Sequence, residues 1–190
     1  MKKLILVLFG LFSMTLFSQS KTILSSEIRW KAYKTLKAES LSHFGTVKLK
    51  SGNLMFNGSE LTGGNFVIDM KTMDAEDMND SPKQKKMLEN HLKSDDFFDT
   101  SKFPTASFQI KSVKKIKNAN YNYQVVGILT IKGISKNSSF PLKVSESNSV
   151  YTLSSGKFTF NRKNYGLRYN IFEDMLISND VQMNITIKAK

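Results

Sequence analysis

One histidine and three aspartates lie close together in the segment from His91 to Ile110, and their residue types could support metal or acid–base chemistry. His91 is followed by Asp95, Asp96 and Asp99. Zinc sites, however, use several nitrogen or sulfur ligands at close spacing, and one histidine with aspartates on a turn fits that pattern poorly. The chain has one other histidine and no cysteine. We therefore expect no metal site here, and a structural role for His91 at a helix end.

The sequence also lacks the usual motifs of covalent catalysis and nucleotide binding. It has no Gly-x-Ser-x-Gly nucleophile elbow and no cysteine nucleophile, and neither histidine occurs in a triad motif with serine and aspartate. Walker and Gly-x-Gly-x-x-Gly motifs are missing as well. The prediction is a protein that is not an enzyme, with no catalytic residue and no cofactor. The enzymatic alternative is a hydrolase that uses His91 with Asp95, Asp96 or Asp99.

A helix is expected immediately before this segment. Ser81 stands at the N-cap position, Pro82 suits the first helical position, and Gln84 occupies the capping-box position. Residues 84–93 are rich in helix formers. An apolar stripe at helical spacing should face the rest of the protein. The stripe consists of Met87, Leu88, His91 and Leu92.

Most of the remaining chain alternates apolar and polar residues in short runs, which is the pattern of half-buried β-strands. In one run, Ala106, Phe108 and Ile110 alternate with polar neighbours. Asn57-Gly58 and Lys132-Gly133 are turn signals between such runs. The pattern predicts a mainly β, single-domain protein. Spacing alone leaves an antiparallel sandwich and a closed barrel equally open.

Large apolar side chains occur in nearly every expected strand, and they supply the candidate ligand-binding residues. An eight-stranded barrel can be filled by its own side chains or can hold one elongated small ligand. Burial alone does not distinguish the two states. If the interior is open, the side chains expected to form the cavity wall are Trp30, Phe56, Phe66, Ile68, Phe108 and Phe158.

The N-terminus has the pattern of a secretory signal peptide. Lys2 and Lys3 precede an apolar run over residues 4–17, and small or polar residues follow at 18–20. The apolar run is about 14 residues long, shorter than the roughly 20 residues that span a bilayer. The sequence therefore predicts a signal peptide over residues 1–20 and one domain over residues 21–190. We expect export, either to the periplasm or out of the cell.

The charge of the chain limits its partners. The formal net charge is +12, and it falls to +10 without Lys2 and Lys3. Such a basic protein favours anionic surroundings, among them an anionic membrane surface, while an exported protein is not expected to meet nucleic acid. Without cysteine, no disulfide stabilises the fold. The oligomeric state stays open, and a dimer is compatible with the sequence.

Several segments resemble the YceI-like family. The strongest resemblance is in HLKSDDFFDTSKFPTASF, residues 91–108. Three other segments resemble family elements and occur in the family's order. They are GGNFVIDMKTMDAED from Gly63, VVGILTIKGISKNSSFPLKV from Val125 and FTFNRKNYGL from Phe158. The resemblance extends over residues 30–188.

This resemblance implies an extended eight-stranded antiparallel, lipocalin-like barrel with one helix packed near one end. It also implies that a long-chain lipid of polyisoprenoid type occupies the interior, with Phe97 and Phe98 near that ligand or beneath the helix. The resulting hypothesis is an exported, non-catalytic protein that sequesters or carries such a lipid. The alternative is a surface adhesion or interaction module that uses its basic outer face and has a filled barrel.

Overall fold

A computed structural model describes residues 19–34, 42–168 and 177–190 of the chain. The helices are α1 (Pro82–Lys93) and two short 3-10 helices, η2 (Glu76–Met78) and η3 (Arg162–Tyr165). The strands are β1 (Gln19–Lys34), β2 (Ser42–Asn57), β3 (Glu60–Asp74), β4 (Thr105–Lys115), β5 (Tyr123–Ile131), β6 (Ile134–Ser147), β7 (Val150–Ser155), β8 (Phe158–Asn161) and β9 (Ile177–Ala189).

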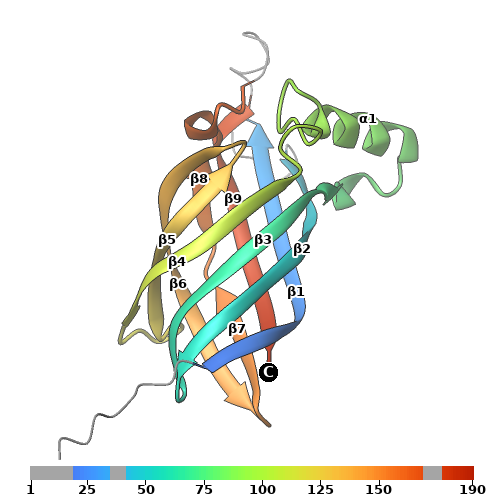
Figure 1. The fold of residues 1–190 in the computed structure, drawn as a ribbon. Coiled ribbons are helices and arrows are strands. Elements are labelled where there is room, and N and C mark those ends of the chain that lie inside the picture. The colour runs from blue at the N-terminus through green and yellow to red at the C-terminus, as the bar shows by residue number, and fades with distance from the viewer. Residues whose placement is uncertain (1–18, 35–41, 169–176) are drawn as a thin grey trace, which may run out of the picture.

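The strands close into an antiparallel barrel (Figure 1). Each strand from β1 to β7 pairs with the next, β7 pairs with β9, and β9 returns to pair with β1. β8 pairs with the part of β9 around Met183, whereas β7 pairs with the part around Ile187. β7 and β8 therefore share one place in the wall, and the described strands form the predicted eight-stranded barrel. Pairing of β1 with β9 removes the sandwich alternative.

The alternating pattern decides which side chains face inward. On β4, Ala106 and Phe108 are buried, while Ser107 and Gln109 between them are more exposed. Because successive side chains of a strand point to opposite faces, the apolar set lines the interior and the polar set meets solvent. The sequence prediction of a mainly β fold is confirmed.

Buried side chains gather in two clusters at different heights of the barrel. One cluster includes Leu54, Phe56 and Tyr151, near the β2–β3 and β6–β7 hairpins at the lower end in Figure 1. The other includes Met70 and Phe97, near the end covered by α1. Members of both clusters line the cavity described below, whereas Leu54, Phe56 and Tyr151 at the lower end do not.

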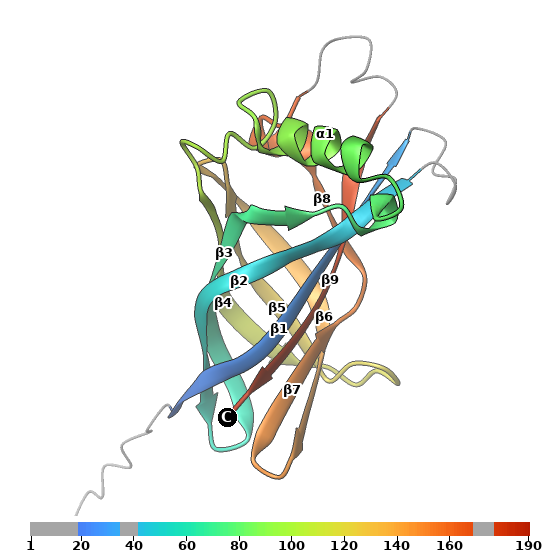
Figure 2. The ribbon, with the colours of Figure 1, turned by 90° about the vertical axis from the view of Figure 1, so that its right-hand side faces the viewer.

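α1 lies across the upper end of the barrel rather than along its side (Figure 2). It begins at Pro82, as predicted, but the side chain of Ser81 makes no capping hydrogen bond. The expected apolar stripe is also only partly correct. Leu88, His91 and Leu92 are half-buried, whereas Met87 is 64% exposed. A helix that crosses a barrel end touches it along a narrow line, so the fourth member of the stripe remains in solvent.

The predicted signal peptide lies almost wholly outside the described residues. Gln19 and Ser20 are described, and they form the start of β1, opposite Phe56 and Met55 on β2. The domain boundary after residue 20 remains a prediction.

No described helix combines the length and the apolar character needed to cross a membrane.

Candidate functional site

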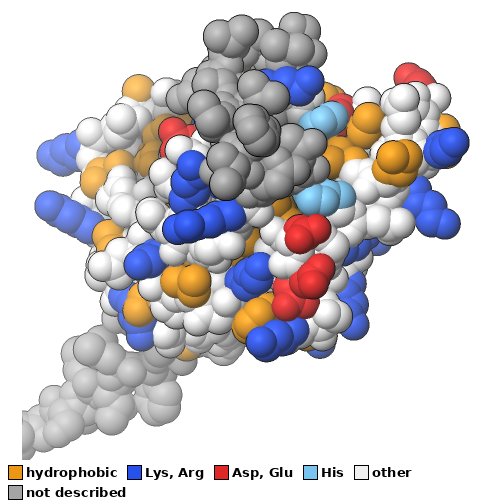
Figure 3. Space-filling model, turned by 90° about the horizontal axis from the view of Figure 1, so that it is seen from above, with side chains coloured by type: hydrophobic (Ala, Val, Ile, Leu, Met, Phe, Trp, Pro, Cys, Tyr) orange, Lys and Arg blue, Asp and Glu red, His pale blue; other side chains and the backbone are white. Residues whose placement is uncertain are grey.

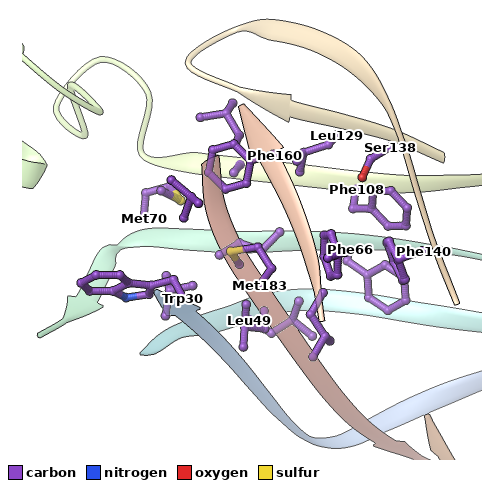
Figure 4. Close-up of a pocket in the computed structure, with 18 of the residues that line it drawn as sticks. Trp30, Leu49, Phe66, Met70, Phe108, Leu129, Ser138, Phe140, Phe160 and Met183 are labelled. Carbon is purple, nitrogen blue, oxygen red and sulfur yellow. The ribbon is translucent and has the colours of Figure 1, made fainter. Parts of the chain in front are cut away.

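The barrel interior contains a cavity of about 170 Å³. Side chains from nearly all strands and from the segment after α1 line it, and they are almost entirely apolar (Figure 4). Among the described lining residues, Ser138 carries a hydroxyl and Arg162 a charge. The indole nitrogen of Trp30 donates to the carbonyl oxygen of Thr46 at 3.2 Å. The surface offered to a guest molecule is therefore apolar with very few polar points.

Most of the residues predicted to bind a ligand line this cavity. They come together from β1, β3, β4, β8 and the segment after α1, although they are far apart in the sequence. These residues are Trp30, Phe66, Ile68, Phe97, Phe98, Phe108 and Phe158. Their contact with a ligand remains a prediction.

Phe56 is the predicted wall residue that does not line the cavity. Its side chain is fully buried in the lower cluster, where its ring centroid lies 4.2 Å from that of Tyr151. The alternating pattern correctly places Phe56 inside the barrel. It carries no information about height along the barrel axis, and Phe56 lies at the end where side chains fill the interior.

Other lining residues were not selected from the sequence, although many of them are apolar residues of alternating runs. Phe140 is the most consequential, because its ring stacks on Phe158 with a centroid distance of 4.3 Å and an interplanar angle of 18°. Strand parity was the signal that could have found these residues. Figure 4 labels the apolar ones Leu49, Met70, Leu129, Phe140, Phe160 and Met183.

Phe97 and Phe98 close the upper end of the cavity beneath α1. Their rings meet edge to face at 5.0 Å. The turn that carries them is fixed by backbone hydrogen bonds, including Phe98 N to Leu92 O at 3.1 Å. Lys132, in the β5–β6 turn, donates to the carbonyl oxygen of Phe97 at 2.8 Å. The segment after α1 thus joins the helix to the opposite wall of the barrel.

The histidine and the aspartates of this segment lie in different surroundings. The ring of His91 lies 6.1 Å from that of Phe97, and Asp95 and Asp96 are exposed. Asp99 accepts hydrogen bonds from Ser101 and from the backbone of Lys102. Across the described ranges, no three His, Cys, Asp or Glu side chains are placed to hold a metal ion.

Arg162 is a residue that sequence reasoning missed. Its side chain is fully buried at the start of η3, and it lines the cavity. Within the described part of the chain, the guanidinium donates to the backbone carbonyl oxygens of Leu167 from Nη1 at 2.9 Å, of Ser178 from Nε at 3.2 Å and of Ile177 from Nη2 at 3.3 Å. Arg162 therefore ties η3 to the start of β9.

Ion pairs connect α1 to the end of β3. Lys85 Nζ lies 2.5 Å from Asp74 Oδ1 and 4.0 Å from Glu89 Oε1. Glu89 Oε1 also accepts a hydrogen bond from the backbone of Ala75 at 3.1 Å. The hydrogen bond from Lys85 holds the pKa of Asp74 below its usual range, and the same contact raises the pKa of Lys85. These charges fix α1 in place over the barrel end.

η2 is fastened to β2 by a second polar group. The backbone of Phe44 donates to Asp77 Oδ1 at 2.9 Å, and His43 Nδ1 lies 2.8 Å from Asp77 Oδ2. Thr46 donates to Glu76 Oε1 at 3.0 Å. We call α1, η2 and these contacts the cap. The cap is attached to the barrel in two places. An ion pair joins α1 to β3, and hydrogen bonds join η2 to β2.

The contribution of the Lys85–Asp74 pair should disappear in acid. Because the pKa of Asp74 is depressed in the folded protein, its stabilisation is present above the unfolded-state value of about 3.9 and is lost as pH falls through the lower folded value. Lys85→Gln should therefore destabilise the protein more at pH 7 than at about pH 3, which lies below the unfolded-state pKa of the aspartate. Urea unfolding at both pH values measures this. Lys86→Gln, an exposed neighbour on α1, is the control, and an equal Lys85 effect at both pH values would contradict the prediction.

Comparison with known sequences identifies a family over most of the chain. The YceI-like domain matches residues 23–189. A UPF0312 protein of Staphylococcus aureus strain N315 is 40% identical over 92 residues, which cover 43% of this chain and 47% of that protein. A UPF0312 protein of the bovine strain RF122 is 39% identical over the same length. The aligned part thus spans about half the length of these curated relatives.

Solved structures share the barrel at low sequence identity. BcnA of Burkholderia cenocepacia is 21% identical, with a TM-score of 0.71 over 87% of this chain and 96% of its own. A polyisoprenoid binding domain from Saccharophagus degradans is 13% identical, with a TM-score of 0.61 over 90% and 97%. The Campylobacter jejuni YceI protein is 22% identical, with a TM-score of 0.59 over 76% and 84%. At these identities the likeness establishes the fold.

Proposed function

The chain belongs to the YceI-like family, and we propose that it is an exported, non-catalytic protein that carries or sequesters a long-chain lipid of polyisoprenoid type inside its barrel. The observation that carries this proposal is the apolar cavity. Its walls are mostly aromatic and aliphatic. Among the described lining side chains, the polar groups are the Ser138 hydroxyl, the Arg162 guanidinium and the Trp30 indole nitrogen. Such a surface suits a hydrocarbon chain and offers little to a polar substrate.

Burial of hydrocarbon supplies enough free energy for useful affinity. At roughly 0.8 kcal/mol per methylene, about ten enclosed carbons give a gross gain near 8 kcal/mol before the costs of ordering are subtracted. The present cavity of about 170 Å³ resembles in size the apolar cavities of roughly 150 Å³ that admit benzene. A longer chain needs the walls to move apart. Met70, Met73 and Met183 line the cavity, and methionine side chains adapt readily to new shapes.

The lipid class is supported by a structural relative. The Saccharophagus degradans protein with the same fold is a polyisoprenoid binding domain. The cavity of the present chain has the apolar character that an isoprenoid chain requires, and it runs between walls contributed by many strands. We therefore propose polyisoprenoids as the class of ligand for this protein and name no particular lipid.

Export is proposed from the N-terminal sequence. Two lysines, an apolar run and a short polar stretch follow one another in residues 1–20, which is the order of a secretory signal peptide. The periplasm and the extracellular medium are the two destinations compatible with it. In either place a lipid of this kind needs a protein to shield it from water.

An interaction module with a filled barrel has less support than a lipid carrier. It requires side chains to occupy the interior, whereas the interior holds a cavity. The face seen from above also carries both signs of charge, with Lys and Arg around its rim and Asp and Glu among them (Figure 3). A single basic docking face is not what this end of the barrel presents.

The test is to purify the protein from the organism that encodes it and to look for bound lipid. Native mass spectrometry should show a mass above that of the polypeptide, and organic extraction should release a long-chain lipid with isoprene repeats. The purified apoprotein should also bind cis-parinaric acid, a fluorescent long-chain probe. Protein that carries no lipid and does not bind the probe would contradict the proposal.

A further inference from the structure

The barrel wall contains a seam where two neighbouring strands do not pair. β6 pairs with β5 from Ile134 to Leu142, but with β7 only from Leu142 to Ser147. Across the described residues, the second edge of β6 from residue 135 to residue 140 therefore has no partner strand. β8 lies beside this stretch, yet its hydrogen-bonded neighbour is β9 alone.

Local sequence explains why pairing stops at this point. Pro141 on β6 has no N–H to donate, and proline is found in sheets mainly at edges and irregularities. Gly156 interrupts the strand path between β7 and β8. The backbone N–H of Gly156 donates to the carbonyl oxygen of Pro141 at 3.0 Å. This hydrogen bond marks the lower end of the seam. Beyond it, the facing edges of β6 and β8 do not pair with each other in the described part of the chain.

At the seam, side chains and no backbone hydrogen bonds separate the cavity from solvent. Ser138 and Phe140 on β6, and Phe158 and Phe160 on β8, all line the cavity. Phe140 and Phe158 stack across the seam at 4.3 Å. Figure 4 shows Ser138 and Phe140 on one side of the cavity, close to Phe108. Rotation of one aromatic side chain would open the wall without breaking a strand pair.

The capped end is held by polar contacts that the seam does not have. Lys85 with Asp74, His43 with Asp77, and Thr46 with Glu76 attach the cap on two sides. To lift α1 the protein must break the Lys85–Asp74 pair and also uncover Phe97, which is 7% exposed. To open the seam it must separate the stacked rings of Phe140 and Phe158, and Phe140 also lies 5.3 Å from Phe108, but no strand pairing or ion pair between these two strands has to break. Opening the seam therefore breaks fewer polar contacts than lifting α1.

We propose that a long-chain lipid enters and leaves the barrel sideways through the seam between β6 and β8, with the Phe140–Phe158 stack as its gate. This inference rests on the proposed lipid-binding function. A narrow slit suits a chain-shaped ligand, which can pass through along its length. The unpaired edge of β6 and the hydroxyl of Ser138 offer hydrogen-bonding groups to the polar end of such a lipid during passage.

Cross-linking tests the route, because the chain has no cysteine of its own. Ser139→Cys with Thr159→Cys places two exposed thiols on the outer face of the seam, where a short bismaleimide can join them. Asp74→Cys with Lys85→Cys, treated in the same way, locks α1 of the cap to the end of β3. Each pair blocked with N-ethylmaleimide is the matched control. Stopped-flow fluorescence with cis-parinaric acid gives the rates of binding and release.

The seam cross-link should slow both rates at least about tenfold with little change in the dissociation constant, because it blocks a passage and not the site. The cap cross-link should leave both rates within about twofold. Phe158→Leu should raise both rates about fivefold, because it removes one ring-stacking interaction. Slowing by the cap cross-link and not by the seam cross-link would overturn the route alone. Failure of the wild-type protein to bind the probe would overturn the proposed function and the route together.

Discussion

Leu129→Trp is expected to weaken lipid binding at least about a hundredfold, which corresponds to about 2.7 kcal/mol. Leu129 lies on β5, opposite Phe108 on β4, and its side chain lines the cavity. An indole in its place would occupy much of a space of about 170 Å³. The added ring fills a void rather than a packed core, so the usual overpacking cost of about 1–3 kcal/mol should be at the low end. Fluorescence titration with cis-parinaric acid measures the affinity, and urea unfolding measures the stability.

Val126→Trp is the matched control for this prediction. Val126 is on the same strand but on its outer face, where it is 38% exposed and does not line the cavity. The variant adds the same indole to the protein and should bind the probe as the wild type does. If Leu129→Trp bound the probe with unchanged affinity, the ligand would have to lie outside the barrel, and the lipid-carrier proposal would be wrong.

Strand parity explains why so much of the wall could be predicted from the sequence. In a closed barrel each strand has one inner and one outer face, so a run such as Phe66, Ile68 and Met70 must be either entirely inside or entirely outside. Apolar character then selects the inside. The positions of Phe108 and Phe158 followed from the same argument, and the structure places both at the cavity.

Height along the barrel and the state of the interior could not be predicted in this way. Phe56 and Phe66 have the same apolar character and both point inward, but one is packed against Tyr151 and the other faces the cavity. The difference depends on how all strands come together at each level, which is a property of the whole fold. Met87 shows the same limit for the helix, because its exposure depends on where α1 crosses the barrel.

Arg162 was missed for a related reason. It is followed by Lys163 and Asn164, and such a polar run is typical of an exposed loop. Its burial results from the carbonyl oxygens of Ile177 and Ser178, about fifteen residues further along the chain. Contacts of this kind leave no local pattern in the sequence.

Arg162→Met is expected to lower the free energy of unfolding by about 3–5 kcal/mol. Methionine approximates the length of the side chain but donates no hydrogen bond. The carbonyl oxygens of Leu167, Ile177 and Ser178 would each lose a donor, and a buried acceptor without a partner costs about 1–3 kcal/mol. Urea unfolding followed by circular dichroism measures the loss.

Two further variants separate the role of the guanidinium from the removal of a positive charge. Arg162→Lys keeps the charge, but a single ammonium group cannot reproduce the planar guanidinium that reaches both Leu167 after η3 and the first residues of β9. This variant should therefore recover only a minor part of the lost stability. Lys157→Met removes a charge from an exposed position just before β8 and should leave the stability nearly unchanged. A loss below about 1 kcal/mol in Arg162→Met would contradict the prediction, because it would mean that the three carbonyl oxygens find other donors. The attachment of η3 to β9 would then not depend on Arg162.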